Sequence, residues 1–128
     1  MKSFITIFAL VLIMNNQDIL MVINQYRGFN HLPALQNSQT LKKTTEYRVN
    51  DMVKNNYFAH NKFSNILEIF KVNFKVAGEN IAKGYDNESK LVDAWMASPK
   101  HREQILDKRF KYAGVSNKDG ITVLHLTD

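Results

Sequence analysis

The residues best suited to chemistry are two histidines and a glutamate, each beside a short motif of aromatic, small or polar residues. His60 closes the sequence Tyr-Phe-Ala-His at positions 57–60, and Glu79 lies within Ala-Gly-Glu-Asn-Ile-Ala at positions 77–82. His101 follows a predicted helix that carries the single tryptophan of the chain. We predict that all three lie at the ends of secondary-structure elements, where functional groups are commonly displayed.

These three side chains suit two kinds of site. Two imidazoles and a carboxylate can coordinate a divalent metal such as zinc. They can equally form a hydrogen-bonded network in which the carboxylate orients an imidazole. The intervals between them, 19 residues (60 to 79) and 22 residues (79 to 101), match no compact metal-binding motif. The spacing therefore leaves both interpretations open.

A metal-dependent hydrolase is the catalytic interpretation of the same residues. In it, His60 and His101 bind the metal, the metal activates a water molecule, and Glu79 acts as the general base. If Glu79 is itself a metal ligand, no obvious base remains. A serine hydrolase is disfavoured because Ser98 precedes Pro99 at a predicted helix start, where its hydroxyl is expected to cap the helix. The chain shows no other convincing set of nucleophile, base and orienting group.

The other two histidines carry weaker signals. His31 lies in a polar loop, and His125 alternates with apolar residues in the last predicted strand. For each of them alone, we expect a surface or packed imidazole rather than a ligand.

The elements that must position these residues are helices first and a hairpin last. Apolar periodicity and end signals predict helices from Asn16 or Asp18 to Gly28, over 38–55, from a Ser64 cap to residue 70, over 88–97 and over 99–106. Residues 75–83 are expected to be extended or to form a tight turn, and Asp119-Gly120 predicts a hairpin between two strands. This order predicts an α+β domain with helices packed on a small antiparallel sheet.

The composition fits one globular domain. The chain has 128 residues, 45% of them apolar, a formal net charge of +5 and no cysteine. The basic residues are scattered, which favours a solvated basic surface over a specific nucleic-acid site. The absence of cysteine excludes disulfides, thiolate metal sites and a thiol nucleophile.

The N-terminus predicts export. Residues 1–15 form a signal-like segment: a lysine precedes an apolar run from Phe4 to Met14, eleven residues long, although no clear cleavage site follows it. A run of this length is too short to span a bilayer, which needs about 20 residues. A signal or anchor is favoured over an uncleaved arm packed on the domain. We place the domain itself at residues 16–128.

Four ordered motifs resemble the CAP superfamily in its bacterial form, also termed SCP-like, to which cysteine-rich secretory proteins and plant pathogenesis-related proteins belong. The resemblance covers about Ile19 to Leu126 and rests on the sequences at 57–60, 78–82, 95–106 and 114–115. It implies an α-β-α sandwich and an extracellular setting. It also implies a cleft lined by two histidines and acidic residues, which binds a divalent metal in some relatives.

The resemblance assigns His60, Glu79 and His101 to this cleft. Ser98 stands where many eukaryotic members have a second cleft glutamate, so the four-residue metal site of those relatives is incomplete here, and any metal is expected to be held weakly. His125 stands where a glutamine is common in the last strand. That change either brings a third imidazole to the cleft or leaves it facing solvent.

Three functions are consistent with these residues. The favoured one is a secreted, non-enzymatic binding module whose cleft takes a divalent metal or small ligand. The alternatives are the metal-dependent hydrolase with Glu79 as base, and a structural or cell-surface interaction domain with a vestigial cleft. In the last case the net positive charge would guide the protein to an anionic cell wall or host surface. The ligand or surface partner itself is unknown.

Overall fold

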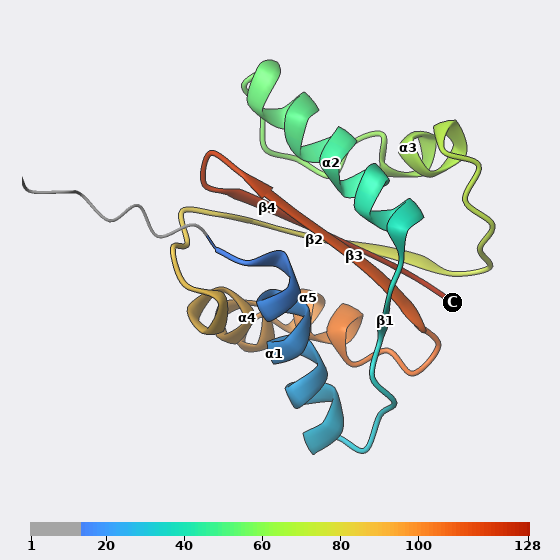
Figure 1. Ribbon diagram of the computed structural model, residues 1–128, viewed down its shortest axis with the longest axis vertical. Helices are drawn as coiled ribbons and strands as arrows, with labels where there is room; N and C mark the ends of the chain where they lie inside the picture. The colour runs from blue at the N-terminus through green and yellow to red at the C-terminus, as the bar shows by residue number, and fades with distance from the viewer. Residues whose placement is uncertain (1–13) are drawn as a thin grey trace, which may run out of the picture.

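One of the two inner strands of the sheet, residues 121–127, is buried along its whole length, because helices cover the sheet on both faces. A computed structural model describes residues 14–128, so the signal-like segment lies outside the described residues except for its last two positions. The sheet has four strands in the order β1-β3-β4-β2 (Figure 1). Their bounds are Gln36–Asn37 for β1, Ala77–Lys83 for β2, Tyr112–Lys118 for β3 and Ile121–Thr127 for β4.

Two layers of helices enclose this sheet. Helices α2 (Gln39–Lys54) and α3 (Phe63–Ile69) cover one face. The other face carries α1 (Asn16–Phe29), α4 (Glu88–Ala97) and α5 (Pro99–Ile105) (Figure 1). The predicted α+β sandwich is confirmed. The sheet is mixed rather than wholly antiparallel, because the two residues of β1 pair parallel to β3.

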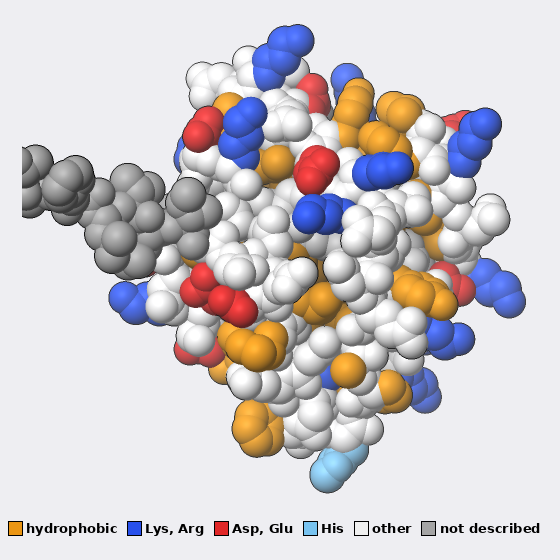
Figure 2. Space-filling view, in the orientation of Figure 1, with side chains coloured by type: hydrophobic (Ala, Val, Ile, Leu, Met, Phe, Trp, Pro, Cys, Tyr) orange, Lys and Arg blue, Asp and Glu red, His pale blue; other side chains and the backbone are white. Residues whose placement is uncertain are grey.

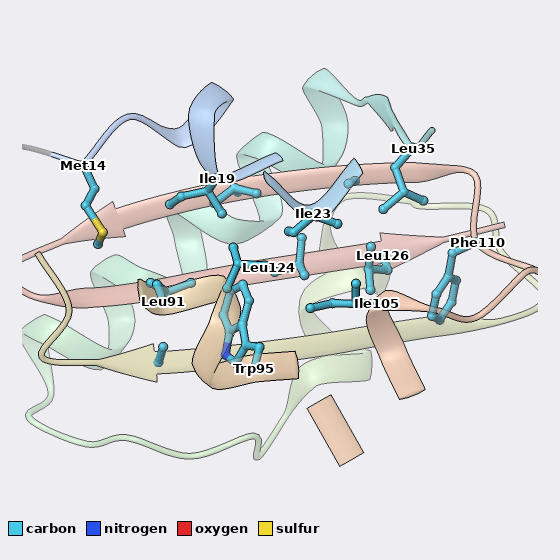
Figure 3. Packing of buried hydrophobic residues seen from close by; sticks show 14 residues of the cluster. Met14, Ile19, Ile23, Leu35, Leu91, Trp95, Ile105, Phe110, Leu124 and Leu126 are labelled. Carbon is cyan, nitrogen blue, oxygen red and sulfur yellow. The ribbon is translucent and has the colours of Figure 1, made fainter. Parts of the chain in front are cut away.

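The larger core lies between the sheet and the layer of α1, α4 and α5. Side chains from three directions meet there (Figure 3), with Ile23 from α1, Trp95 from α4 and Leu124 from β4 each at most 2% exposed. The Trp95 indole N–H also donates to the carbonyl of Ile81 at 3.2 Å, which ties α4 to the edge strand β2. Burying a side chain of this size stabilises the fold by about 1.5–3 kcal/mol.

On the opposite face, α2 lies almost directly on the backbone of β3. A Cβ built at Gly114 would come within 2.2 Å of the carbonyl carbon of Leu41, so this position has no room for a side chain. A smaller apolar cluster of Val49, Met52 and Val123 fills the space beside this contact. The close approach fixes the distance between α2 and the sheet. It therefore also fixes the positions of the α2 side chains that point toward the sheet.

A buried arginine joins the ends of several elements. The guanidinium of Arg27, at the end of α1, donates to the carbonyls of Pro33, Ile105, Asp107 and Phe110 at 2.8–3.2 Å. Arg27 is only 1% exposed. The α1 loop and the segment after α5 are thereby held at one end of the sandwich.

Several predicted helix ends are wrong by one to three residues. Asn15 rather than Asn16 or Asp18 caps α1, which continues through Gly28 to Phe29. Ser64 does not cap α3: the cap position is Lys62, which has a left-handed backbone and makes no side-chain cap bond. The helix predicted from Ser38 is confirmed, with the Ser38 hydroxyl accepting from the Leu41 N–H at 3.1 Å.

Candidate functional site

Glu79 is the centre of a buried polar cluster beneath α2. It lies in β2, at one edge of the sheet, and its register partner in β4 is His125. Residues paired in this way point to the same face, and the His125 Nε2 lies 2.7 Å from the Glu79 Oε2. The Glu79 side chain is only 2% exposed and the His125 side chain is fully buried.

Arg48 brings a positive charge to this carboxylate from α2. Its Nε donates to Oε2 at 3.0 Å and its Nη2 donates to Oε1 at 2.9 Å, which is a bidentate pair. The Nη1 donates to the carbonyl of Asn61, so the guanidinium also holds the loop that follows His60. Arg48 is fully buried.

His125 is held as a neutral ring. Burial lowers its pKa, although Glu79 opposes this shift. A neutral imidazole has one N–H, and the carboxylate requires it at Nε2 because an ionised carboxylate only accepts. The Nδ1 therefore accepts from the Thr44 hydroxyl, which lies 2.7 Å away. The same hydroxyl donates to the Leu41 carbonyl at 2.9 Å, so the ring and the carbonyl share its single proton.

His60 completes the contacts of Glu79 from the loop between α2 and α3. Its Nδ1 lies 2.9 Å from the Glu79 Oε1, and its side chain is 55% exposed. Because the carboxylate accepts, a proton lies on Nδ1 of His60, and the neutral tautomer of that kind has its lone pair on Nε2. The Nε2 lone pair of His60 is therefore available to a ligand.

Glu79 itself has little capacity left to accept further hydrogen bonds. Burial alone would raise its pKa, but the hydrogen bonds from His125 and Arg48 outweigh burial and hold the pKa below its usual value. The ionised carboxylate accepts four hydrogen bonds, two from Arg48 and one each from His60 and His125. A carboxylate offers about four lone-pair sites, so all of them are occupied.

His101 approaches the same edge of the sheet from the other helical layer. It lies in α5, and its carbonyl accepts from the Asn80 side chain at 3.1 Å. Burial, and then the charge of His60, lowers the pKa of His101. His101 carries a free lone pair at neutral pH.

The structure thus joins three of the predicted residues by hydrogen bonds and places a fourth, His101, in a helix that packs against β2. His60, Glu79 and His125 form one network, and the backbone of His101 is bonded to Asn80, the residue after Glu79. Ser98 occupies the cap position of α5, but its hydroxyl makes no cap hydrogen bond, so the predicted capping role is wrong. Within residues 14–128, no group of three or more histidine, aspartate or glutamate side chains is arranged to hold a metal ion.

Sequence reasoning did not identify Arg48 and Thr44. Both lie on the buried face of α2 with Leu41, Val49 and Met52. An arginine within an apolar helical stripe is itself a signal, because a buried charge needs a partner of opposite sign. The sequence does not show which carboxylate that partner is.

The motifs that surround these residues match a known family. The family model of the cysteine-rich secretory protein family, CAP, matches residues 20–120. The chain belongs to this family. The match includes His60, Glu79 and His101 in the CAP domain, and the sandwich described above is the domain architecture that the resemblance implied.

Relatives and solved structures agree with this assignment. An uncharacterized protein of Bacillus subtilis, YkwD, is 37% identical over 97 residues, which is 72% of this chain and 38% of that protein. An extracellular protein with an SCP domain from Bacillus anthracis superposes with a TM-score of 0.83 and 29% identity, over 87% of this chain and 39% of that one. An outer surface protein of Borrelia burgdorferi shares the fold with a TM-score of 0.77 at 22% identity, over 88% and 90% of the two chains.

The CAP domain described here spans less than two fifths of the length of the B. subtilis and B. anthracis relatives. Two of these relatives are named as extracellular or outer-surface proteins. None of the helices within residues 14–128 is both long and apolar enough to cross a membrane.

Proposed function

We propose that this CAP domain is an exported, non-enzymatic binding module whose ligand is taken up by the imidazoles of His60 and His101. The observation that carries the proposal is the saturation of Glu79 by Arg48, His60 and His125. A carboxylate used in this way orients His60 and fixes its tautomer. The two imidazoles are the groups of this cluster with lone pairs to offer.

The hydrolase is the weaker candidate for the same reason. A general base needs an accessible lone pair and a pKa near the working pH. Glu79 is 2% exposed and its pKa is lowered, so it is a weak base with no free lone pair. Within residues 14–128, neither His60 nor His101 is hydrogen-bonded to a serine or threonine hydroxyl that could act as a nucleophile.

A divalent cation such as zinc is the simplest ligand for two neutral imidazoles. Catalytic zinc has three protein ligands and structural zinc has four. His60 and His101 supply two, so the donor set fits a weak, reversible site with open positions and not a closed resident centre. In such a site the protein holds the ion, and a further ligand completes its coordination.

Zinc titration by calorimetry of the purified chain tests this proposal. We expect the heat of binding to disappear in His60→Ala and in His101→Ala. His31→Ala is the matched control, because His31 is exposed and lies in a loop after α1. Unchanged binding in both site variants would reject the histidine site and leave an interaction domain with a vestigial cleft. That alternative predicts retention on an anionic polymer that weakens as salt rises.

Export is the second part of the proposal. It is supported by the apolar run at residues 4–14 and by the extracellular relative at 29% identity. Fractionation of the native host followed by N-terminal sequencing tests it. The proposal predicts protein outside the cytoplasm, whereas an intact Met1 confined to the cytoplasmic fraction would reject it.

A further inference from the structure

One end of the sandwich carries exposed lysines together with exposed aromatic rings. Two segments of the chain supply them: residues 71–75, in the loop after α3, and residues 108–112, which lead into β3. Phe74 is 42% exposed and precedes the exposed Lys75, and Tyr112 is 41% exposed and follows the exposed Lys111. The C-terminus lies at this end in Figure 1, and Figure 2 shows Lys and Arg side chains gathered along it.

The end of β4 holds these two segments on either side of it. The Lys111 N–H donates to the carbonyl of Thr127 at 2.8 Å. The Lys75 N–H donates to the side chain of Asp128, also at 2.8 Å. Because β4 lies between β2 and β3, the backbones of the two lysines are two strand spacings apart, about 10 Å. Lysines at this separation can contact successive charged groups of one extended polymer.

A shallow pocket of about 250 Å³ opens beside these lysines, between the start of α2 and the end of β4. Its lining residues include Thr40, Lys71, Asn73 and Tyr112. An aromatic ring offers a flat apolar surface to one face of a sugar ring, and hydroxyl, amide and ammonium groups form hydrogen bonds with sugar hydroxyls. These residue types therefore suit one ring of a polysaccharide.

Positive charge exceeds negative charge at this end. Two carboxylates, those of Asp107 and Asp128, lie among five cations: Lys71, Lys75, Lys108, Arg109 and Lys111. Arg109 is paired with Asp107 at 2.7 Å, and the Asp128 side chain accepts from two backbone N–H groups. The four lysines are exposed, and within residues 14–128 none of them forms an ion pair with a carboxylate. They are therefore available to an anionic partner.

We propose that this end of the domain binds an acidic polysaccharide, with one sugar ring against Tyr112 in the pocket and acidic groups of neighbouring rings against Lys75 and Lys111. A concave pocket beside the charges suits a chain of separate rings better than a flat membrane surface. The choice of a polysaccharide over a nucleic acid rests on the proposed export, which places the domain among extracellular polymers. The surface shares no residue with the histidine site.

Calorimetric titration of the purified full chain with oligogalacturonate tests the proposal. We expect saturable binding that weakens as the salt concentration rises. The methyl-esterified oligomer keeps the sugar rings and loses the charges, whereas polyglutamate keeps the charges and lacks the rings. Each of these two polymers should bind more weakly than oligogalacturonate by about tenfold or more, a factor that corresponds to about 1.4 kcal/mol.

Two pairs of lysine substitutions locate the surface. Lys75→Gln combined with Lys111→Gln should weaken oligogalacturonate binding by about tenfold or more. Lys54→Gln combined with Lys83→Gln is the matched control, because it removes the same charge from the last residue of α2 and from the far end of β2. It should change the affinity by less than about twofold, since distant exposed charges are screened by salt. All four lysines are exposed, so both double variants are expected to fold.

Tyr112→Val tests the aromatic contact, because it removes the ring and keeps a residue suited to a strand. It should weaken binding of oligogalacturonate by about tenfold but leave the weaker binding of polyglutamate unchanged. A merely structural effect of the substitution would lower the affinity for both polymers equally, and that result would contradict the proposed role of the ring.

Three further results would overturn the proposal. They are the absence of saturable binding, equal affinity for oligogalacturonate and polyglutamate, and equal losses of affinity in the two double lysine variants. Binding to vesicles that contain anionic lipids, with none to oligogalacturonate, would assign the surface to a membrane instead. His60→Ala should leave the affinity for oligogalacturonate unchanged, so this proposal and the proposed zinc site succeed or fail separately.

Discussion

Arg48 and Glu79 form a buried ion pair whose two charges depend on each other. Their mutual attraction largely offsets the free energy of removing both charges from water, so the intact pair adds little net stability. Removing one partner leaves the other charge buried without compensation, which costs about 3–5 kcal/mol. The pair therefore acts mainly to fix where the carboxylate points.

Arg48→Met should lower the free energy of unfolding by about 3–5 kcal/mol, because Met keeps the volume but leaves Glu79 unpaired. Urea denaturation measures this change. Arg109→Met is the control: Arg109 also pairs with a carboxylate, that of Asp107, but its side chain is 61% exposed. An exposed pair is worth about 0–1 kcal/mol. Equal losses in the two variants would contradict the account of the buried cluster.

His125 gives the protein a pH dependence of known sign. Its folded pKa is lowered by burial, so the folded state resists protonation that the unfolded state accepts below about pH 6.5. Its contribution to stability is present above that pH and is lost as the pH falls, by at most about 1.4 kcal/mol per pH unit. We therefore expect His125→Gln to flatten the fall in unfolding free energy between pH 7 and pH 5, and parallel curves for the two proteins would contradict this.

The sequence motifs indicated the residues of the candidate site but not the bonds between them. Short motifs singled out His60, Glu79 and His101, and the structure brings them to one sheet edge. The orienting role of Glu79 was one of two open interpretations, because motif spacing does not report which groups fill a carboxylate's lone pairs. His125 is fully buried because of the strand register, and Arg48 is fully buried because of how α2 packs on the sheet. Neither followed from local sequence.

Helix α2 carries both Thr44 and Arg48, so its distance from the sheet controls the cluster. Gly114 sets that distance, since any side chain there meets the backbone of α2 at Leu41 and Lys42. We expect Gly114→Ala to destabilise the protein by about 1–3 kcal/mol or more through overpacking against the α2 backbone. It should also weaken zinc binding, because a shift of α2 carries Arg48 with it, and Arg48 holds Glu79 and the loop that follows His60.

Gly28→Ala provides the matched control at the element scale. A Cβ at Gly28 would have no atom within 4 Å, and the residue is helical. Alanine should therefore stabilise by about 0.5–1 kcal/mol. Both values are measured by urea denaturation. A neutral Gly114→Ala would contradict the close packing of α2 on β3.

Elements with strong local signals were predictable from the sequence. The Asp119-Gly120 hairpin and the amphipathic helices α1 and α2 are confirmed, since turn residues and apolar periodicity define them locally. Strand β1 was not predicted, because two residues carry no periodicity and its pairing with β3 joins segments about 76 residues apart (36 to 112). The start of α3 was missed because its backbone turn at Lys62 has no sequence mark.

At the scale of the whole molecule, the two histidines of the proposed site come from different helical layers of the sandwich. His60 lies in the loop between α2 and α3, on one face of the sheet, and His101 lies in α5, on the other face. The ligand-binding pair that we propose would therefore combine both layers.

The protonation and ligation of the imidazole nitrogens, followed by long-range proton–nitrogen NMR during a zinc titration, test this central claim most directly. The account predicts that zinc changes the nitrogen signals of His60 Nε2 and of His101. It also predicts that His125 keeps its proton on Nε2 and does not respond. Zinc-dependent change at His125 or His31, with none at His60 and His101, would contradict it.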